Sequence, residues 1–137
     1  MLIGKLTKPI ILTLSLVTFG IGQDSRDQTI QITFPITGAV IDTNFVNVTF
    51  TVASFFELGD PQNQEGDGYA VIYLDDISQA VAYSVTPVIV SGIAEGIHNL
   101  KIELVDLNGA SFSPAVLDTA NFTVTWFQSQ IYVILVI

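Results

Sequence analysis

The 137-residue sequence contains no cysteine. This absence excludes disulfide bonds, thiolate metal sites, thiol nucleophiles and the lipid-modified cysteine of a bacterial lipoprotein. Small secreted animal domains usually depend on disulfides, so a cysteine-free exported domain fits a bacterial secretory route better. The stability of the chain must therefore come from side-chain packing.

Basic residues are scarce, with four Lys and Arg against thirteen Asp and Glu. All thirteen acidic residues follow residue 22, but Arg26 and Lys101 are the only basic ones that do, so residues 23–137 carry a net charge of −11. Such a surface repels phosphate backbones and anionic lipid heads. We expect no nucleic-acid partner and no polybasic membrane contact, whereas cations or basic surfaces are attracted.

Catalytic groups are also few. His98 is the single histidine, and the sequence has no Gly-x-Ser-x-Gly motif, so a nucleophilic triad lacks its base. Paired carboxylates for glycoside hydrolysis need a cleft and a fixed separation. Asp75 and Asp76 project to opposite faces if a strand continues through them, which makes them a poor acid/base pair. We predict that the protein is not an enzyme.

The N-terminus has the pattern of a secretory signal peptide. Lys5 and Lys8 precede an apolar run at residues 10–19, which Gly20-Ile21-Gly22 follows as a cleavage site. The apolar run is about half of the roughly 20 residues that cross a bilayer. We therefore predict a signal peptide at residues 1–22, a mature chain without a membrane span, and a secreted or cell-surface location.

Period-two alternation dominates the rest of the chain. In residues 46–52 the apolar side chains share one face of a strand and Asn47, Thr49 and Thr51 share the other. Residues 98–104 and 121–126 repeat the pattern, which places Trp126 in the core. Shorter segments rich in β-branched or aromatic residues lie at 30–34, 69–74, 80–85 and 88–91.

About seven short strands, with no helical pattern between them, predict an all-β fold. The expected fold is an antiparallel immunoglobulin-like β-sandwich over residues 30–127, with an Asn108-Gly109 hairpin turn. Residues 23–29 form a flexible polar N-terminus, and residues 128–137 form an apolar tail.

Several motifs resemble a known family: Pro35-Ile36-Thr37-Gly38-Ala39-Val40, Asp67-Gly68-Tyr69, Ile93-Ala94-Glu95-Gly96-Ile97-His98 and Ser113-Pro114-Ala115-Val116. They are similar to immunoglobulin-like (fibronectin III- or cadherin-like) modules of secreted bacterial surface proteins of Bacteroidetes type. Such modules serve as spacers, adhesion units and carriers beside enzymes. The resemblance implies a non-catalytic adhesion, assembly or spacer role, with a protein or glycan at the cell surface as the partner.

His98 opens a predicted strand directly after a glycine-containing corner. In β-sandwiches a polar aromatic side chain at such a corner hydrogen-bonds back to the preceding loop, as the tyrosine corner does. We interpret His98 as a structural corner residue rather than as a catalytic group or a metal ligand.

Carboxylates are dense in the polar segment at residues 57–68. Calcium takes six to eight oxygen ligands, which a loop of this composition can supply. The hypothesis is a calcium site formed by Asp60, Glu65, Asp67 and Asp75, and no other cofactor is expected. The alternative, which the absence of EF-hand spacing favours, is a solvated loop that keeps the protein soluble.

Tyr69, Tyr73 and Tyr83 are candidates for a carbohydrate-binding platform. Aromatic rings stack on the apolar faces of sugars, and nearby carboxylates accept hydroxyl protons. Alternation places Tyr69 and Tyr73 on one strand face, so they are equally typical of ordinary sheet aromatics.

Three residues lie in glycosylation motifs. Asn47 and Asn121 begin Asn-x-Thr sequons, which matter in a eukaryotic secretory pathway. Thr119 lies in Asp118-Thr119-Ala120, a match to the short O-glycosylation motif known from Bacteroidetes.

The segment from Ile131 to Ile137 is uncharged and has high β-propensity. It is too short to span a membrane. Three interpretations remain: a last strand of the sandwich, a strand donated to another subunit in self-association, or the end of a shortened reading frame.

Overall fold

The computed structural model describes residues 27–126, and all regular structure in this range is β. No helix long and apolar enough to cross a membrane occurs among these residues. The strands are β1 (Ile30–Phe34), β2 (Val40–Ile41), β3 (Phe45–Val52), β4 (Gly68–Leu74), β5 (Ile77–Ala82), β6 (Val88–Ser91), β7 (Gly96–Asp106) and β8 (Ser111–Val124).

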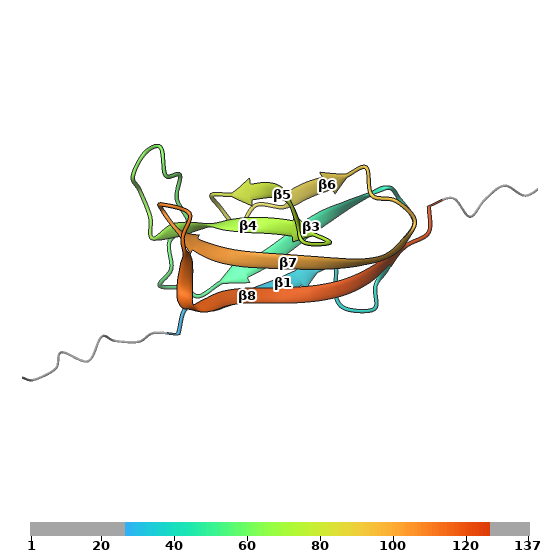
Figure 1. Ribbon diagram of the computed structural model, residues 1–137, viewed down its shortest axis with the longest axis horizontal. Coiled ribbons are helices and arrows are strands. Elements are labelled where there is room, and N and C mark those ends of the chain that lie inside the picture. Colours follow the sequence, from blue (N-terminus) through green and yellow to red (C-terminus); the bar gives the residue numbers. More distant parts are fainter. Residues whose placement is uncertain (1–26, 127–137) are drawn as a thin grey trace, which may run out of the picture.

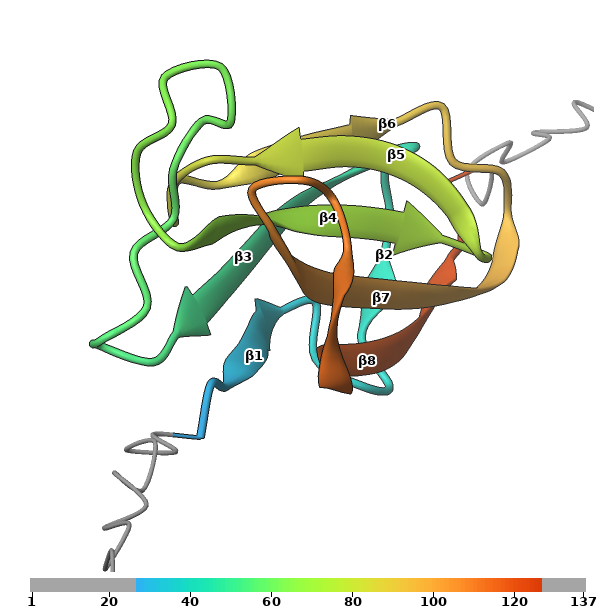
Figure 2. The same cartoon turned by 60° about the vertical axis from the view of Figure 1, so that its left-hand side comes forward.

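The strands form two sheets, one in the order β1-β3-β6 and the other in the order β2-β8-β7-β4-β5 (Figures 1 and 2). All pairs are antiparallel except β2 with β8. The chain changes sheets between β1 and β2, where Pro35 is fully buried and Gly38 has a φ of 87°. The described chain begins at one end of the sandwich and finishes at the other (Figure 1).

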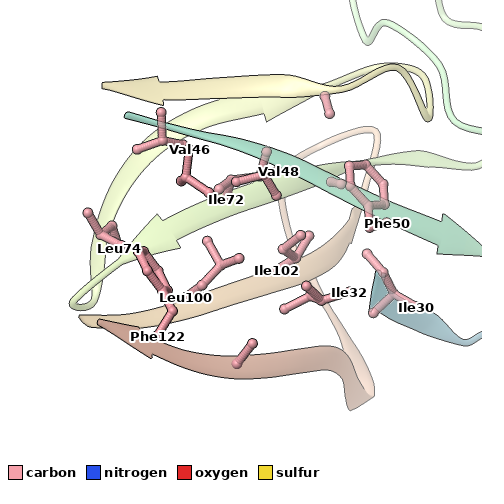
Figure 3. Packing of buried hydrophobic residues seen from close by; sticks show 14 of the residues in the cluster. Ile30, Ile32, Val46, Val48, Phe50, Ile72, Leu74, Leu100, Ile102 and Phe122 are labelled. Atoms are coloured by element: carbon pink, nitrogen blue, oxygen red, sulfur yellow. The ribbon is translucent and has the colours of Figure 1, made fainter. Parts of the chain in front are cut away.

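The core lies between the two sheets and follows from the alternation of each strand. Val46, Val48 and Phe50 of β3 point into it and face side chains of β4, β7 and β8 (Figure 3). Burial of one such side chain stabilises the fold by about 1.5–3 kcal/mol. No polar or charged residue in the described range is buried. The two sheets packed around this core confirm the predicted β-sandwich.

The last strand is much longer than predicted, because β8 begins at Ser111 and not at residue 121. Residues 111–120 lack a clean apolar alternation and contain Pro114. Proline has no N–H to donate, and Pro114 lies in the register shift between the pairs Leu104–Val116 and Val105–Ser111, where residues 112–115 have no paired residue in β7. Pairing of Ser111 and of residues 116–120 with β7 keeps the rest of this segment extended.

Tight turns follow both β4 and β7. Asp75 and Asp76 have φ values of 51° and 65°, so they form the β4–β5 turn and no strand continues through them. The condition under which the two side chains would project to opposite faces is therefore not met, because two aspartates in the left-handed region reverse the chain. The Asn108-Gly109 hairpin is present, with Gly109 at a φ of 80°.

Trp126 is not a core residue, and this prediction was wrong. Its side chain is 40% exposed and its Nε1–H donates a hydrogen bond of 3.0 Å to the carbonyl of Ile93. The reason is its position beyond the end of β8 at Val124. Likewise β5 ends at Ala82, so Tyr83 follows the strand.

The predicted signal peptide and the segment from Ile131 to Ile137 lie outside the described residues.

Candidate functional sites

His98, near the start of β7, joins two loops at one end of the sandwich. Its Nδ1 lies 2.7 Å from Oδ2 of Asp75 in the β4–β5 turn, and its Nε2 lies 2.9 Å from the carbonyl oxygen of Ala94. The imidazole packs at 5.8 Å from the ring of Phe122 and is 11% exposed. Each ring nitrogen therefore lies within hydrogen-bond distance of one oxygen atom.

Asp75 also fixes the turn to the next strand. Its Oδ1 accepts the backbone N–H of Asn99 at 2.9 Å, and its own N–H donates to the carbonyl of Asn99. Partial burial raises the pKa of Asp75, but the Asn99 N–H and the hydrogen bond and charge of His98 outweigh it, so the pKa lies below its ordinary value of 3.8.

The four calcium candidates are spread over both ends of the sandwich. Asp60 and Asp67 belong to the β3–β4 loop, where Asp60 accepts the N–H of Gln62 and Asp67 accepts the N–H of Glu57. Asp75 lies at the far end of β4, and a seven-residue strand spans about 20 Å. Within residues 27–126 no three His, Cys, Asp or Glu side chains form a group that could hold a metal ion.

The β3–β4 loop itself is fastened by close backbone contacts. Gly59 N–H donates to the carbonyl of Gly68 and Asp67 N–H donates to the carbonyl of Glu57. A Cβ on Gly59 would overlap the carbonyl oxygen of Glu65. The loop therefore folds back on itself, with glycine where two backbone segments meet.

The tyrosine candidates lie on the outer side of the five-stranded sheet. Tyr69 and Tyr83 form an edge-to-face pair with ring centroids 5.7 Å apart. Tyr73 points to the same side of β4, but Nζ of Lys101 lies 4.3 Å above its ring. The structure brings Tyr69 and Tyr83 together, whereas Tyr73 is four residues along the strand and its ring face is occupied.

The glycosylation candidates all lie on strand surfaces. Asn47 is exposed on β3, and Asn121 and Thr119 are exposed on β8. Oδ1 of Asn121 accepts a hydrogen bond of 2.9 Å from Nδ2 of Asn99 on the neighbouring strand.

A shallow hollow of about 310 Å³ beside β1, β2 and β3 was not predicted from the sequence. Its lining includes Phe34, Val40, Asp42, Phe45 and Asn47. Both phenylalanines are exposed, in contrast to the buried apolar residues next to them. Phe45 stands at a polar position of the alternation in β3, in phase with Asn47, and this is the signal that the sequence contained. Phe34 is in phase with the buried Ile30 and Ile32, but the register of β1 shifts between Ile32 and Phe34, and Phe34 is exposed.

Two further aspartates have structural roles that were not predicted. Oδ2 of Asp118 accepts the N–H of Ile32 at 2.8 Å, which links β8 to β1 of the other sheet. Oδ1 of Asp106 accepts the N–H groups of Asn108 and Ala110 in the hairpin. The hydrogen bond from Ala110 and its neighbours in the turn lower the pKa of Asp106.

Comparison with solved structures identifies the class of the fold. The fibronectin(III)-like modules of Clostridium thermocellum CbhA are similar, with a TM-score of 0.55 and 18% sequence identity over 72% of this chain and 97% of that chain. No family model matches the sequence, and no curated protein matches it. The chain thus has a fibronectin(III)-like, immunoglobulin-like β-sandwich fold.

Proposed function

We propose that the protein is a non-catalytic, exported β-sandwich module with a spacer or adhesion role. The observation that carries the proposal is that His98 and five aspartates make hydrogen bonds within the fold. His98 binds Asp75 and Ala94, and five aspartates accept backbone N–H groups, namely Asp60, Asp67, Asp75, Asp106 and Asp118. These side chains hold turns and strands together, as is expected of a structural module.

The path of the chain supports a spacer role. The described residues enter the sandwich at one end and leave at the other (Figure 1). A module with this geometry adds its full length to any chain that continues on both sides. Fibronectin(III)-like architecture is shared by many extracellular modules, and the acidic composition favours solubility.

The first test is export. The gene is expressed in a bacterial host with the natural N-terminus, and the N-terminal residue and location of the product are determined. We expect an exported protein that begins at Gln23. Retention in the cytoplasm with residues 1–22 intact would contradict the proposal.

The spacer or adhesion role is tested by deletion of the gene and by complementation with a variant. Deletion of the gene in the native host should reduce surface attachment or the reach of a surface structure, and the His98→Gln protein, if it folds, should restore it. A need for the imidazole in a folded protein would argue for catalysis instead.

Glycan binding is a second candidate, which the Tyr69–Tyr83 pair favours. Tyr83→Ala removes one ring of the pair, whereas Tyr73→Ala removes a ring that Lys101 covers. If sugars stack here, glycan-array binding falls in the first variant and remains in the second. Equal behaviour of both variants would remove this candidate.

A further inference from the structure

The hairpin between β7 and β8 (Figure 2) contains the one Asn-Gly pair of the sequence, and Asn108 and Gly109 are both exposed at its tip. Glycine has no side chain, so its backbone nitrogen can approach the side-chain carbon of a preceding asparagine without obstruction. The other five asparagines of the chain precede larger residues. Asn108 is therefore the asparagine of this chain that is most prone to cyclise.

The chemistry that follows from such an approach is deamidation, which is one reason why asparagine is thermolabile. The backbone nitrogen of Gly109 loses its hydrogen and forms a bond to Cγ of Asn108, while the bond from Cγ to Nδ2 breaks and ammonia leaves with that hydrogen. Water then opens the succinimide ring and leaves either aspartate or isoaspartate at position 108. The reaction requires no oxidant, metal or other protein.

The hairpin holds both reacting groups on Asp106. The N–H of Gly109 donates a hydrogen bond of 3.0 Å to the carbonyl oxygen of Asp106, and the N–H of Asn108 donates one of 2.8 Å to its Oδ1. The side-chain amide of Asn108 donates to the same carboxylate. Hydrogen bonds from Ala110 and then from Asn108 lower the pKa of Asp106, so this acceptor is ionised at neutral pH.

A further contact covers the turn from the side of β4. A Cβ added to Gly109 would lie 2.9 Å from the hydroxyl oxygen of Tyr69, so the tyrosine lies against the glycine. Tyr69 in turn packs edge-to-face on Tyr83. The closed turn is thus held by Asp106 from within and by Tyr69 from the neighbouring strand.

We infer that Asn108 is a site of spontaneous deamidation and that Asp106 sets its rate by holding both reacting groups in the closed turn. The reaction proceeds from the locally opened turn, whose population falls with each hydrogen bond that the closed turn makes. After the reaction, a carboxylate at position 108 cannot donate to Asp106, and two like charges face each other. The modified hairpin is therefore looser than the original. The reaction depends neither on export nor on a spacer role, so this inference can fail while the proposed function holds.

The test measures the rate of conversion at Asn108. The full chain is incubated at mildly alkaline pH, and mass spectrometry of the peptide that contains Asn108 follows the conversion, with chromatography to separate the isoaspartate form. We expect conversion at least about tenfold faster in urea than in the native state, since urea removes the closed turn. Under native conditions Asp106→Ala should convert at least about fivefold faster than the wild type.

Asp118→Ala is the matched control. Asp118 also accepts backbone N–H groups, those of Ile32 and Thr119, but it lies outside the hairpin. Its loss should leave the rate at Asn108 within about twofold of the wild type, because distant sites act independently. Circular dichroism establishes that each variant is folded. Asp106→Asn is the second variant, since its side-chain oxygen still accepts N–H groups, and its rate should lie between those of the wild type and Asp106→Ala.

Four results would overturn the inference. Equal rates in urea and in the native state would show that the turn does not protect Asn108, and equal acceleration by Asp106→Ala and Asp118→Ala would assign the effect to global stability. Slower conversion in Asp106→Ala would make the carboxylate a promoter of the reaction. Faster conversion of another asparagine in urea would show that Asn108 is not the preferred site.

Discussion

At the scale of single residues, the His98 corner shows how a sandwich uses its rare titratable groups. The sequence places His98 after a glycine-containing corner, and its bond to Ala94 lies within that corner. Asp75 is 23 residues away, and its contact with His98 depends on how the β4–β5 turn sits against β7. Local sequence predicts the first contact, whereas the second exists only through the sheet register.

Asp75 and Asp76 provide a matched pair to measure this corner. Both have positive φ, a conformation that asparagine also tolerates. Asp75→Asn weakens the bonds to His98 and Asn99, so we expect a loss of about 1 kcal/mol in the free energy of unfolding. Asp76 is 88% exposed, and Asp76→Asn should change it by less than about 0.5 kcal/mol. Urea denaturation measures both, and equal losses would contradict a specific role for Asp75.

The lowered pKa of Asp75 predicts a pH dependence of stability. Its folded pKa lies below the ordinary value of 3.8, so its contribution is present above that pH and is lost as the pH falls through the folded pKa. Urea midpoints between neutral pH and strong acid should therefore fall less steeply in Asp75→Asn than in the wild type. Asp106 shifts in the same direction, so the variant keeps part of the decline. Parallel curves for the two proteins would contradict the prediction.

At the scale of elements, alternation was sufficient wherever one strand face is buried. It located β3 and the central part of β7, because their apolar residues all point into one core. It failed for Ser111–Val124, where the first half of the strand is extended by pairing with β7 and not by burial. It also placed β5 at residues 80–85 instead of Ile77–Ala82, because the turn before the strand consists of two aspartates and lacks the glycine that is typical of a hairpin turn.

Two glycine variants show whether close backbone packing limits the β3–β4 loop. Gly59 meets the carbonyl of Glu65, whereas Gly92 has open space around it but a φ of +74°. Gly92→Ala should cost roughly 1–2 kcal/mol from backbone conformation alone. Gly59→Ala should cost about 3 kcal/mol or more, because backbone atoms must move apart. Chemical denaturation and limited proteolysis of the loop measure the difference, and a smaller loss for Gly59→Ala would show that the loop adapts.

At the scale of the whole molecule, the acidic residues are dispersed rather than gathered. The hypothetical calcium ligands Asp60, Glu65, Asp67 and Asp75 share an acidic composition, but β4 separates the last from the others. Composition reveals the charge excess, whereas the distances between carboxylates depend on topology. The alternation of β3 indicates that Phe45 is exposed, but the hollow beside it could not be predicted, since it arises where the chain changes sheets.

Calcium should accordingly have little effect on the folded protein. We expect the melting temperature to change by less than about 2 °C in millimolar calcium, since the dispersed carboxylates offer no site that would favour the native state by mass action. Differential scanning calorimetry with calcium and with a matched concentration of magnesium provides the comparison. A calcium-specific increase that Asp67→Asn abolishes would establish a site in the β3–β4 loop.

The bond between Asp118 and Ile32 links residues 86 positions apart in the chain. During synthesis, the N–H of Ile32 can therefore reach this acceptor only after nearly the whole module has been made. Contacts of such high sequence separation slow folding. The two sheets are thus joined at this point by a contact that only a nearly complete module can make.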